Sequence, residues 1–305
     1  MNTKFESPSF TSLLAEQEAV QEGAFQGRQL AEYESYIFPG RILRRPRSDA
    51  VIDFLAPMSL TERPSLIGLL EGYAQLHEDR QVSWADMGGG RGLAMRAVAT
   101  RHELAQRIHM TNVDLFDHGL SGLMPEEMTA LEVATPNITH DETAPLFIHA
   151  DAETVQLPEP ADIITSIELL QYLNNPLTAM ANWYNQLADG GVMIISTEHN
   201  WTTWIRYSEV YAQHHYNETP TKHLLDALSA AGVQYAATRD LDNENGFRPK
   251  LQPDNINTLA VKKNAGTRMI VHSDVTKVWV NPSNFKATYY NLPKGAPLIE
   301  IVPSE

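Results

Sequence analysis

The stretch that decides the fold is Asp86-Met87-Gly88-Gly89-Gly90-Arg91-Gly92, four glycines within seven residues behind a short apolar run that begins at Val82. Glycine lets the backbone turn sharply and lets a ligand come close to the main chain. Apolar residues resume after the loop, so we expect a strand, a turn and a helix whose first N–H groups face a ligand. A tight turn without any ligand is the plainer alternative.

The spacing within this loop separates two classes of cofactor. The dinucleotide fingerprint G-x-G-x-x-G/A fails, because its third glycine position falls on Leu93 or Met95, depending on the starting glycine. The spacing present is D-x-G-x-G-x-G, and the carboxylate of Asp86 would repel a pyrophosphate. The same charge suits the cationic amino and sulfonium end of S-adenosylmethionine, reached directly or through water.

Strand-like and helix-like segments alternate on both sides of the loop. Apolar runs predict strands over residues 82–87, 108–113, 146–149, 162–167, 192–196, 233–237 and 258–261. Amphipathic runs predict helices over 64–76, after Gly92, after Asn175-Pro176 and after Thr219-Pro220. This alternation predicts an α/β fold, a Rossmann-like and mostly parallel seven-stranded sheet with helices on both faces.

The chain divides into three expected parts. Residues 1–62 are expected to form an N-terminal helical segment that acts as a lid or in oligomerisation, and residues 63–265 form the α/β domain. Residues 266–305 carry short strand-like pieces and predict a small β-rich C-terminal appendage. Those pieces are 269–271, 278–280, 289–290 and 298–302.

Composition excludes several function classes. The formal charge is -15, from 23 Lys+Arg against 38 Asp+Glu residues, and such a surface repels phosphate backbones, so we expect no nucleic-acid partner. The chain has no cysteine and no H-E-x-x-H spacing, so we expect no metal. No apolar stretch approaches the roughly 20 residues that span a bilayer, and the start of the chain does not read as a signal peptide. We therefore expect no membrane partner and a cytoplasmic location. A monomer and a homodimer both remain open.

Later segments resemble, in order, the motifs of the class I S-adenosylmethionine-dependent methyltransferases. The glycine loop resembles the first motif of that family, and the similarity extends over residues 63–263. The later segments are Val113-Asp114, Asp151-Ala152-Glu153, Ala161 to Pro176 and Ala188 to Ile195. The resemblance implies that residues 63–265 bind S-adenosyl-L-methionine and transfer its methyl group by in-line displacement.

The resemblance also implies a set of cofactor-binding residues. In the family, an acidic residue after the second strand binds the ribose hydroxyls, here Asp114, and one after the third strand contacts the adenine amino group, here Asp151. The full set is Asp86, Gly88, Gly89, Gly90, Gly92, Asp114, Asp151, Ala152 and Ser166.

Several of these positions have alternatives. Asp114 could be a helix cap, with Asp117 as the ribose ligand instead, and Asp151 could be a solvated loop acid. Asp162 reads as a strand start and is left out of the site. Glu168 fits a structural and a functional role equally.

The catalytic base is the weakest part of the pattern. The family often has a histidine after the fourth strand, where this chain has Tyr172. A tyrosine hydroxyl is a poor base at neutral pH but can line a pocket or donate a hydrogen bond. His199, just after the fifth strand, is the leading candidate for the base, ahead of His214 and His215. The spacing of Trp204, Tyr207 and Tyr211 equally fits a helix packed on the core.

We expect a small-molecule methyl acceptor, methylated on O, N or C. The N/D-P-P-Y/F signature of nucleic-acid and amide methylation is absent, since the chain has Thr165-Ser166-Ile167-Glu168. A protein acceptor docked on residues 266–305 is the second enzymatic possibility. A non-catalytic relative that binds the cofactor and works as an interaction protein is the third.

Overall fold

The computed structural model describes residues 66–90, 92–99, 101–115, 145–196, 205–207, 220–238, 258–273, 275–280, 286–290 and 297–304. The expected helical segment over residues 1–62 lies outside them. His199, Asp117, His214, His215, Trp204 and Tyr211 also lie outside.

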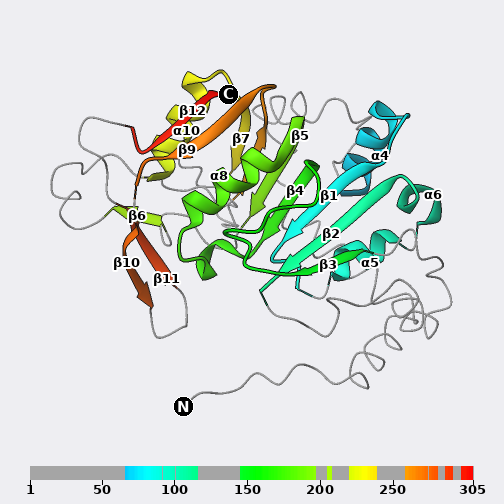
Figure 1. Ribbon diagram of the computed structural model, residues 1–305, viewed down its shortest axis with the longest axis horizontal. Coiled ribbons are helices and arrows are strands. Elements are labelled where there is room, and N and C mark those ends of the chain that lie inside the picture. The colour runs from blue at the N-terminus through cyan, green and yellow to red at the C-terminus, as the bar shows by residue number, and fades with distance from the viewer. Residues whose placement is uncertain are drawn as a thin grey trace, which may run out of the picture.

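A seven-stranded sheet forms the centre, in the order β3-β2-β1-β4-β5-β8-β7 (Figure 1). The strands are β1 (Val82–Met87), β2 (Ile108–Asp114), β3 (Leu146–His149), β4 (Ala161–Ile167), β5 (Leu187–Ser196), β7 (Gln234–Thr238) and β8 (Thr258–Lys262). Strands β1 to β5 pair in parallel, whereas β8 is antiparallel to both of its neighbours. The predicted mostly parallel seven-stranded sheet is confirmed. The strand order reverses between β1 and β4, and ligands of open α/β sheets collect at the carboxyl ends of such strands.

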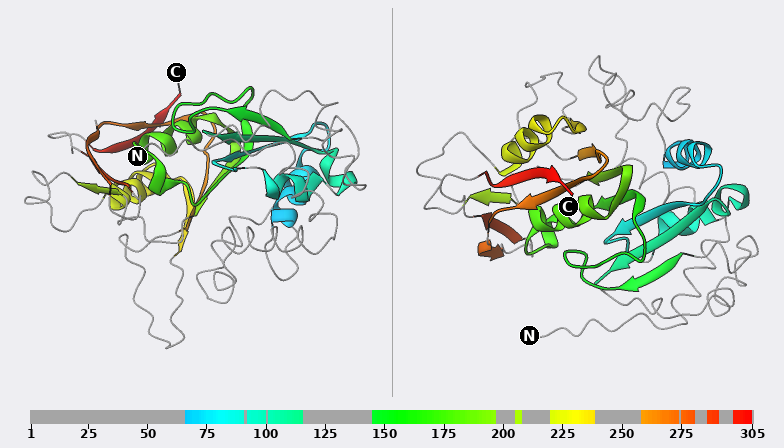
Figure 2. Two further views of the ribbon diagram at one scale, coloured as in Figure 1. Left: turned by 90° about the horizontal axis from the view of Figure 1, so that it is seen from below. Right: turned by 45° about the horizontal axis from the view of Figure 1, so that its top comes forward.

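Helices cover both faces of this sheet because buried strands alternate their side chains between two cores. In β1, Val82 and Trp84 join one hydrophobic cluster, and Ala85 and Met87 join the other. The first cluster includes helices α4 (Leu66–Leu76), α5 (Leu93–Ala99) and α6 (His102–Ala105), and the second includes α8 (Pro176–Gln186) and α10 (Pro220–Ala230). Figure 2 shows α4 on the opposite side of the sheet from α8.

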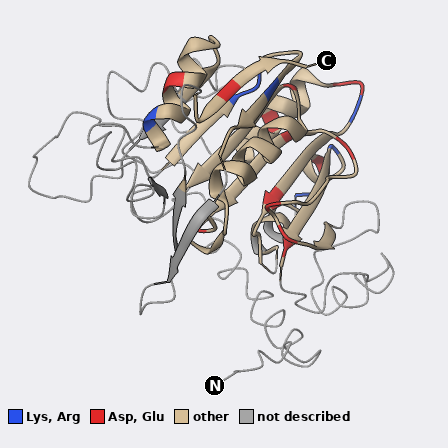
Figure 3. Cartoon of the chain, turned by 60° about the vertical axis from the view of Figure 1, so that its left-hand side comes forward, with Lys and Arg blue, Asp and Glu red and all other residues tan. Residues whose placement is uncertain are grey.

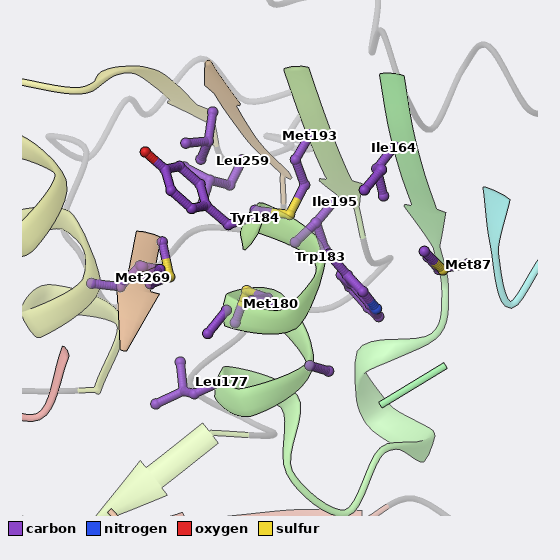
Figure 4. Packing of buried hydrophobic residues seen from close by; sticks show 14 of the residues in the cluster. Met87, Ile164, Leu177, Met180, Trp183, Tyr184, Met193, Ile195, Leu259 and Met269 are labelled. Atoms are coloured by element: carbon purple, nitrogen blue, oxygen red, sulfur yellow. The ribbon is translucent and has the colours of Figure 1, made fainter. Parts of the chain in front are cut away.

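Helix α8 is the main element of the second cluster. It begins as predicted, with Asn175 as the N-cap and Pro176 in the first turn. Its buried residues are spaced three and four apart, which brings Leu177, Met180, Trp183 and Tyr184 onto the sheet (Figure 4). Strand β5 starts at Leu187, ahead of the predicted start at residue 192, and residues 189–191 form a bulge inside it, with Gly190 at a φ of 79°.

The C-terminal residues add two small sheets. Strands β9 (Thr267–Val271) and β12 (Ile299–Pro303) pair antiparallel, and Met269 and Ile299 are buried in the α8 cluster. The predicted β-rich character is confirmed, while the boundary at residue 265 remains a prediction. Strands β10 (Val275–Val280) and β11 (Lys286–Tyr290) form the other sheet with β6 (Ile205–Tyr207). Tyr207 therefore lies in a strand and not in the helix that one interpretation of its spacing required.

Asp162 stabilises the amino-terminal edge of the sheet through hydrogen bonds. Its two carboxylate oxygens accept hydrogen bonds from the Arg80 guanidinium at 2.6 and 2.7 Å, and Oδ2 also accepts from Ser83 N at 2.9 Å. This explains a buried acid at the start of β4. Its contacts agree with leaving Asp162 out of the site.

Candidate functional site

The glycine loop between β1 and α5 owes its shape to left-handed backbone angles. Gly88, Gly90 and Gly92 have φ angles of 76°, 56° and 66°, a region that side chains with a Cβ disfavour. The loop is tied to the end of β2, because Gly88 N and Gly89 N donate to Val113 O at 2.7 and 3.3 Å. The predicted strand–turn–helix is therefore present at the sheet's carboxyl edge.

The loop is closely packed on its inner side and open at Gly90. A Cβ added at Gly89 would stand 2.0 Å from Asn112 Oδ1, and one at Gly88 or Gly92 would meet a side chain within 3.0 Å. At Gly90 the same atom would meet nothing within 4 Å among the described residues. The loop thus has one position where a ligand can approach the main chain.

Asp86 lies beneath the loop rather than on its open side. Its side chain is buried, with the residue only 2% exposed, and Oδ1 accepts a hydrogen bond from Thr165 Oγ1 at 2.7 Å. Thr165 Oγ1 in turn accepts from Trp84 Nε1 at 2.9 Å. The side chain of Asp86 therefore lies on the packed side of the loop, next to Gly89.

Asn112 is a site residue that the sequence reasoning missed. It is 1% exposed in β2, and its Nδ2 donates to Gly90 O at 2.9 Å. Its buried Oδ1 has no hydrogen-bond partner among the described residues. The available signal was an amide near the end of a predicted strand, two residues ahead of Asp114.

Asp114 ends β2 beside the open part of the loop. Its Oδ2 accepts a hydrogen bond from Gly90 N at 2.9 Å. The structure thus brings Asp114 and Gly90 together, as the interpretation of both as cofactor-binding residues requires. An anionic oxygen at this edge can accept hydrogen bonds from ligand hydroxyls.

Asp151 and Ala152 follow the neighbouring strand, β3. The strand ends are adjacent, since Ala150 N donates to Asp114 O at 3.0 Å. Asp151 Oδ1 accepts from Glu153 N at 2.9 Å, which forms a local turn. Ala152 is buried, and its carbonyl accepts from Trp183 Nε1 at 2.7 Å. The two predicted residues therefore share one turn next to Asp114.

The end of β4 supplies polar groups to the same edge. Ser166 is completely buried, and its Oγ has no hydrogen-bond partner among the described residues. Glu168 has a φ of 55°, a left-handed conformation that costs a residue with a Cβ about 1–3 kcal/mol. Its N donates to Ser196 O at 2.9 Å, and its Oε2 accepts from Gln171 Nε2 at 3.0 Å. Strain of this kind gathers at functional sites.

Tyr172 ends a short 3-10 helix, η2 (Leu170–Tyr172), on this side of β4, and it is 53% exposed. This exposure leaves its ring available to line a pocket. The other predicted catalytic residue, His199, lies outside the described residues.

These residues fit a nucleoside cofactor. The open main chain at Gly90, the carboxylates of Asp114 and Asp151 and the buried hydroxyl of Ser166 come from the ends of four neighbouring strands. The donors and acceptors match sugar hydroxyls and an adenine better than a phosphate, which the two carboxylates would repel. Within the described residues no group of acidic or histidine side chains is placed to hold a metal ion.

Comparison with known proteins gives a family match. Residues 43–238, more than half of the chain, match the model of a family described as a methyltransferase domain. No curated protein matches the chain.

Solved structures, among them two methyltransferases, are also similar to the chain. The plantazolicin methyltransferase BpumL, in complex with a substrate analogue and SAH, is 13% identical, with 84% of this chain and 97% of that chain covered and a TM-score of 0.39. The N-methyltransferase NodS from Bradyrhizobium japonicum WM9 is 14% identical over 65% and 94% of the two chains, with a TM-score of 0.34. The YcgJ protein from Bacillus subtilis is 13% identical over 65% and 98%, with a TM-score of 0.36. None of these similarities is close enough to carry an acceptor over to this chain.

Proposed function

The chain belongs to the methyltransferase-domain family and uses S-adenosylmethionine as its methyl donor, and from this premise we propose that its acceptor is a small molecule, methylated on O, N or C. The cofactor supplies an electrophilic methyl group on a cationic sulfur. The protein must then orient the acceptor in line with the C–S bond and exclude water. The open main chain at Gly90 beside Asp114 supports the cofactor site, and the formal charge of -15 is the observation that carries the small acceptor.

Six of the nine predicted residues have a proposed role at the cofactor. Asp114 accepts hydrogen bonds from the ribose hydroxyls, and Asp151 accepts one from the adenine amino group. Gly88, Gly90 and Gly92 keep the loop clear of side chains. Asp86 offsets the positive charge of the cofactor from beneath the loop. Support comes from the position of these groups along one sheet edge.

Charge supports a small acceptor over a nucleic acid. The formal charge of -15 repels phosphates. Among the described elements, basic positions are interspersed with acidic ones and do not gather on one face (Figure 3). None of the described helices is long and apolar enough to cross a membrane. A cytoplasmic location remains part of the proposal.

We place the acceptor beyond the ends of β4 and β5, where the small sheet β6-β11-β10 approaches (Figure 1). Strand β6 follows β5 along the chain and pairs with β11, and β11 contacts η2, which ends at Tyr172. The C-terminal residues thus return to the edge where the predicted cofactor site lies. His199 is proposed as the base, and Tyr172 as a pocket residue that donates a hydrogen bond.

The proposal is tested with methyl-labelled S-adenosylmethionine and a cell extract separated into small-molecule, protein and nucleic-acid fractions. We expect enzyme-dependent label in the small-molecule fraction. Label in protein alone would replace this proposal with the protein acceptor. Label in no fraction, from a protein that binds the cofactor, would favour a non-catalytic relative.

A further inference from the structure

We infer that Glu153 is a positioning residue for the nucleoside end of the cofactor, because it ties the Asp151–Ala152 turn to the first turn of α8. The inference rests on the proposed role of Asp151 at the adenine. It adds a residue from outside the predicted set of cofactor ligands.

The first observation is that α8 does not cap itself. Asn175 occupies the N-cap, yet its side chain makes no capping hydrogen bond, and its buried Oδ1 has no partner among the described residues. The Glu153 carboxylate binds this end of the helix instead. Its Oε2 accepts a hydrogen bond from Asn175 N at 3.0 Å, and its Oε1 accepts one from Asn174 N. An anion is favoured at this end of a helix by the free N–H groups and the helix dipole.

The second observation is that the backbone of Glu153 holds the turn itself. Glu153 N donates to Asp151 Oδ1 at 2.9 Å, and Glu153 O accepts from Asn182 Nδ2 at 3.2 Å. Ala152 O accepts from Trp183 Nε1 at 2.7 Å. The side chain and backbone of one residue therefore connect the Asp151 carboxylate to α8. Loss of the Glu153 carboxylate would remove the link from the turn to Asn174 and Asn175, while the backbone bonds to Asn182 and Trp183 would remain.

Tyr290 offers a matched control for simple loss of a cap. From β11, its Oη accepts a hydrogen bond from Leu177 N at 2.8 Å, so it satisfies another N–H group in the same helical turn. Tyr290 is completely buried. Its removal weakens the α8 terminus without removing the Glu153 carboxylate from the turn.

The experiment measures the dissociation constants of S-adenosylhomocysteine and S-inosylhomocysteine by titration calorimetry. The inosyl compound has a carbonyl in place of the adenine amino group, so a placed Asp151 carboxylate should disfavour it. We expect Glu153→Ala to weaken S-adenosylhomocysteine binding about tenfold and to reduce the preference over the inosyl compound. Tyr290→Phe should lower the Tm but keep the preference of the unmodified protein.

The outcomes separate positioning from capping. If Glu153→Ala and Tyr290→Phe both lower the Tm and both keep the preference, Glu153 is only a helix cap and the inference is overturned. If Glu153→Ala does not fold, Glu153→Gln decides by the same preference, because the amide can still accept one of the two N–H groups. An unmodified protein that binds neither compound overturns the proposed function together with this inference.

Discussion

At the scale of single residues, Asp114 is the proposed ligand of the cofactor's ribose. Its Oδ2 already orients the loop through Gly90 N, 2.9 Å away. We predict that Asp114→Ala weakens S-adenosylhomocysteine binding by about 1–3 kcal/mol, because charge-assisted hydrogen bonds to the ribose are lost. Calorimetry measures this change. The affinity of Asp114→Asn, which keeps an acceptor oxygen, should lie between those of the unmodified protein and Asp114→Ala. Unchanged affinity in Asp114→Ala would move the ribose ligand elsewhere.

The loop glycines were predictable because left-handed backbone angles favour glycine, so such a turn is visible in the sequence as closely spaced glycines. The positions of Asp114 at the end of β2 and of Asp151 just after β3 were expected from the resemblance to the methyltransferase motifs, and their roles as cofactor ligands remain predictions. Asn112 was missed because its role depends on a contact with Gly90 across space, which no local pattern records. The burial of Asp86 under the loop depends in the same way on Thr165, from another strand.

At the scale of elements, Asn185 of α8 binds the backbone of β9, and Tyr184 of the same helix bonds to Thr267 of that strand. Asn185 Oδ1 accepts from Met269 N at 2.7 Å, and its Nδ2 donates to Met269 O at 2.9 Å, as a neighbouring strand would. We predict that Asn185→Ala lowers the free energy of unfolding by about 1–3 kcal/mol, since both backbone groups lose their partner. Urea unfolding measures it, with the exposed Gln156→Ala as the control variant.

The same measurement bears on the boundary predicted at residue 265. If residues 266–305 pack as part of the main core, Asn185→Ala should shift one single unfolding transition. A separate early transition, with the remainder unchanged, would instead support an independent appendage.

The strands of the central sheet were predictable because buried parallel strands are continuous apolar runs. Strand β6 was not, because its partner β11 lies some eighty residues later and its own three residues are too short a run to predict a strand. The early start of β5 at Leu187 was missed for a related reason. The glycines there mark a turn, and only pairing with Ala161 draws the residues before them into the strand.

At the scale of the whole molecule, buried tyrosines make the stability of the folded protein depend on pH in the alkaline range. Burial raises the pKa of Tyr73, Tyr184 and Tyr290 above the ordinary value of 10.0. The unfolded chain therefore releases these protons at lower pH than the folded protein does. Their contribution to stability is complete below about pH 10 and is lost as the pH rises further.

We predict that the Tyr73→Phe variant loses less stability than the unmodified protein between about pH 9 and about pH 11, a range around the ordinary tyrosine pKa. Urea unfolding at each pH measures the loss. At neutral pH the variant should be less stable, because the bond from Tyr73 Oη to Gly190 O is lost. Burial lowers the pKa of Lys263, which acts in the opposite direction. Both proteins carry Lys263, so the comparison isolates Tyr73. Equal slopes would show that Tyr73 does not govern the loss.

The central claim is that the open glycine loop holds S-adenosylmethionine, and a matched pair of glycine variants tests it most directly. Gly90 and Gly232 have similar φ angles of 56° and 62°, and an added Cβ at either meets nothing within 4 Å among the described residues. Alanine should therefore strain both equally, by about 1–2 kcal/mol. Titration of S-adenosylhomocysteine should show binding by the unmodified protein and Gly232→Ala, and at least about tenfold weaker binding by Gly90→Ala. Equal affinity in all three proteins, or no binding by the unmodified one, would contradict the account.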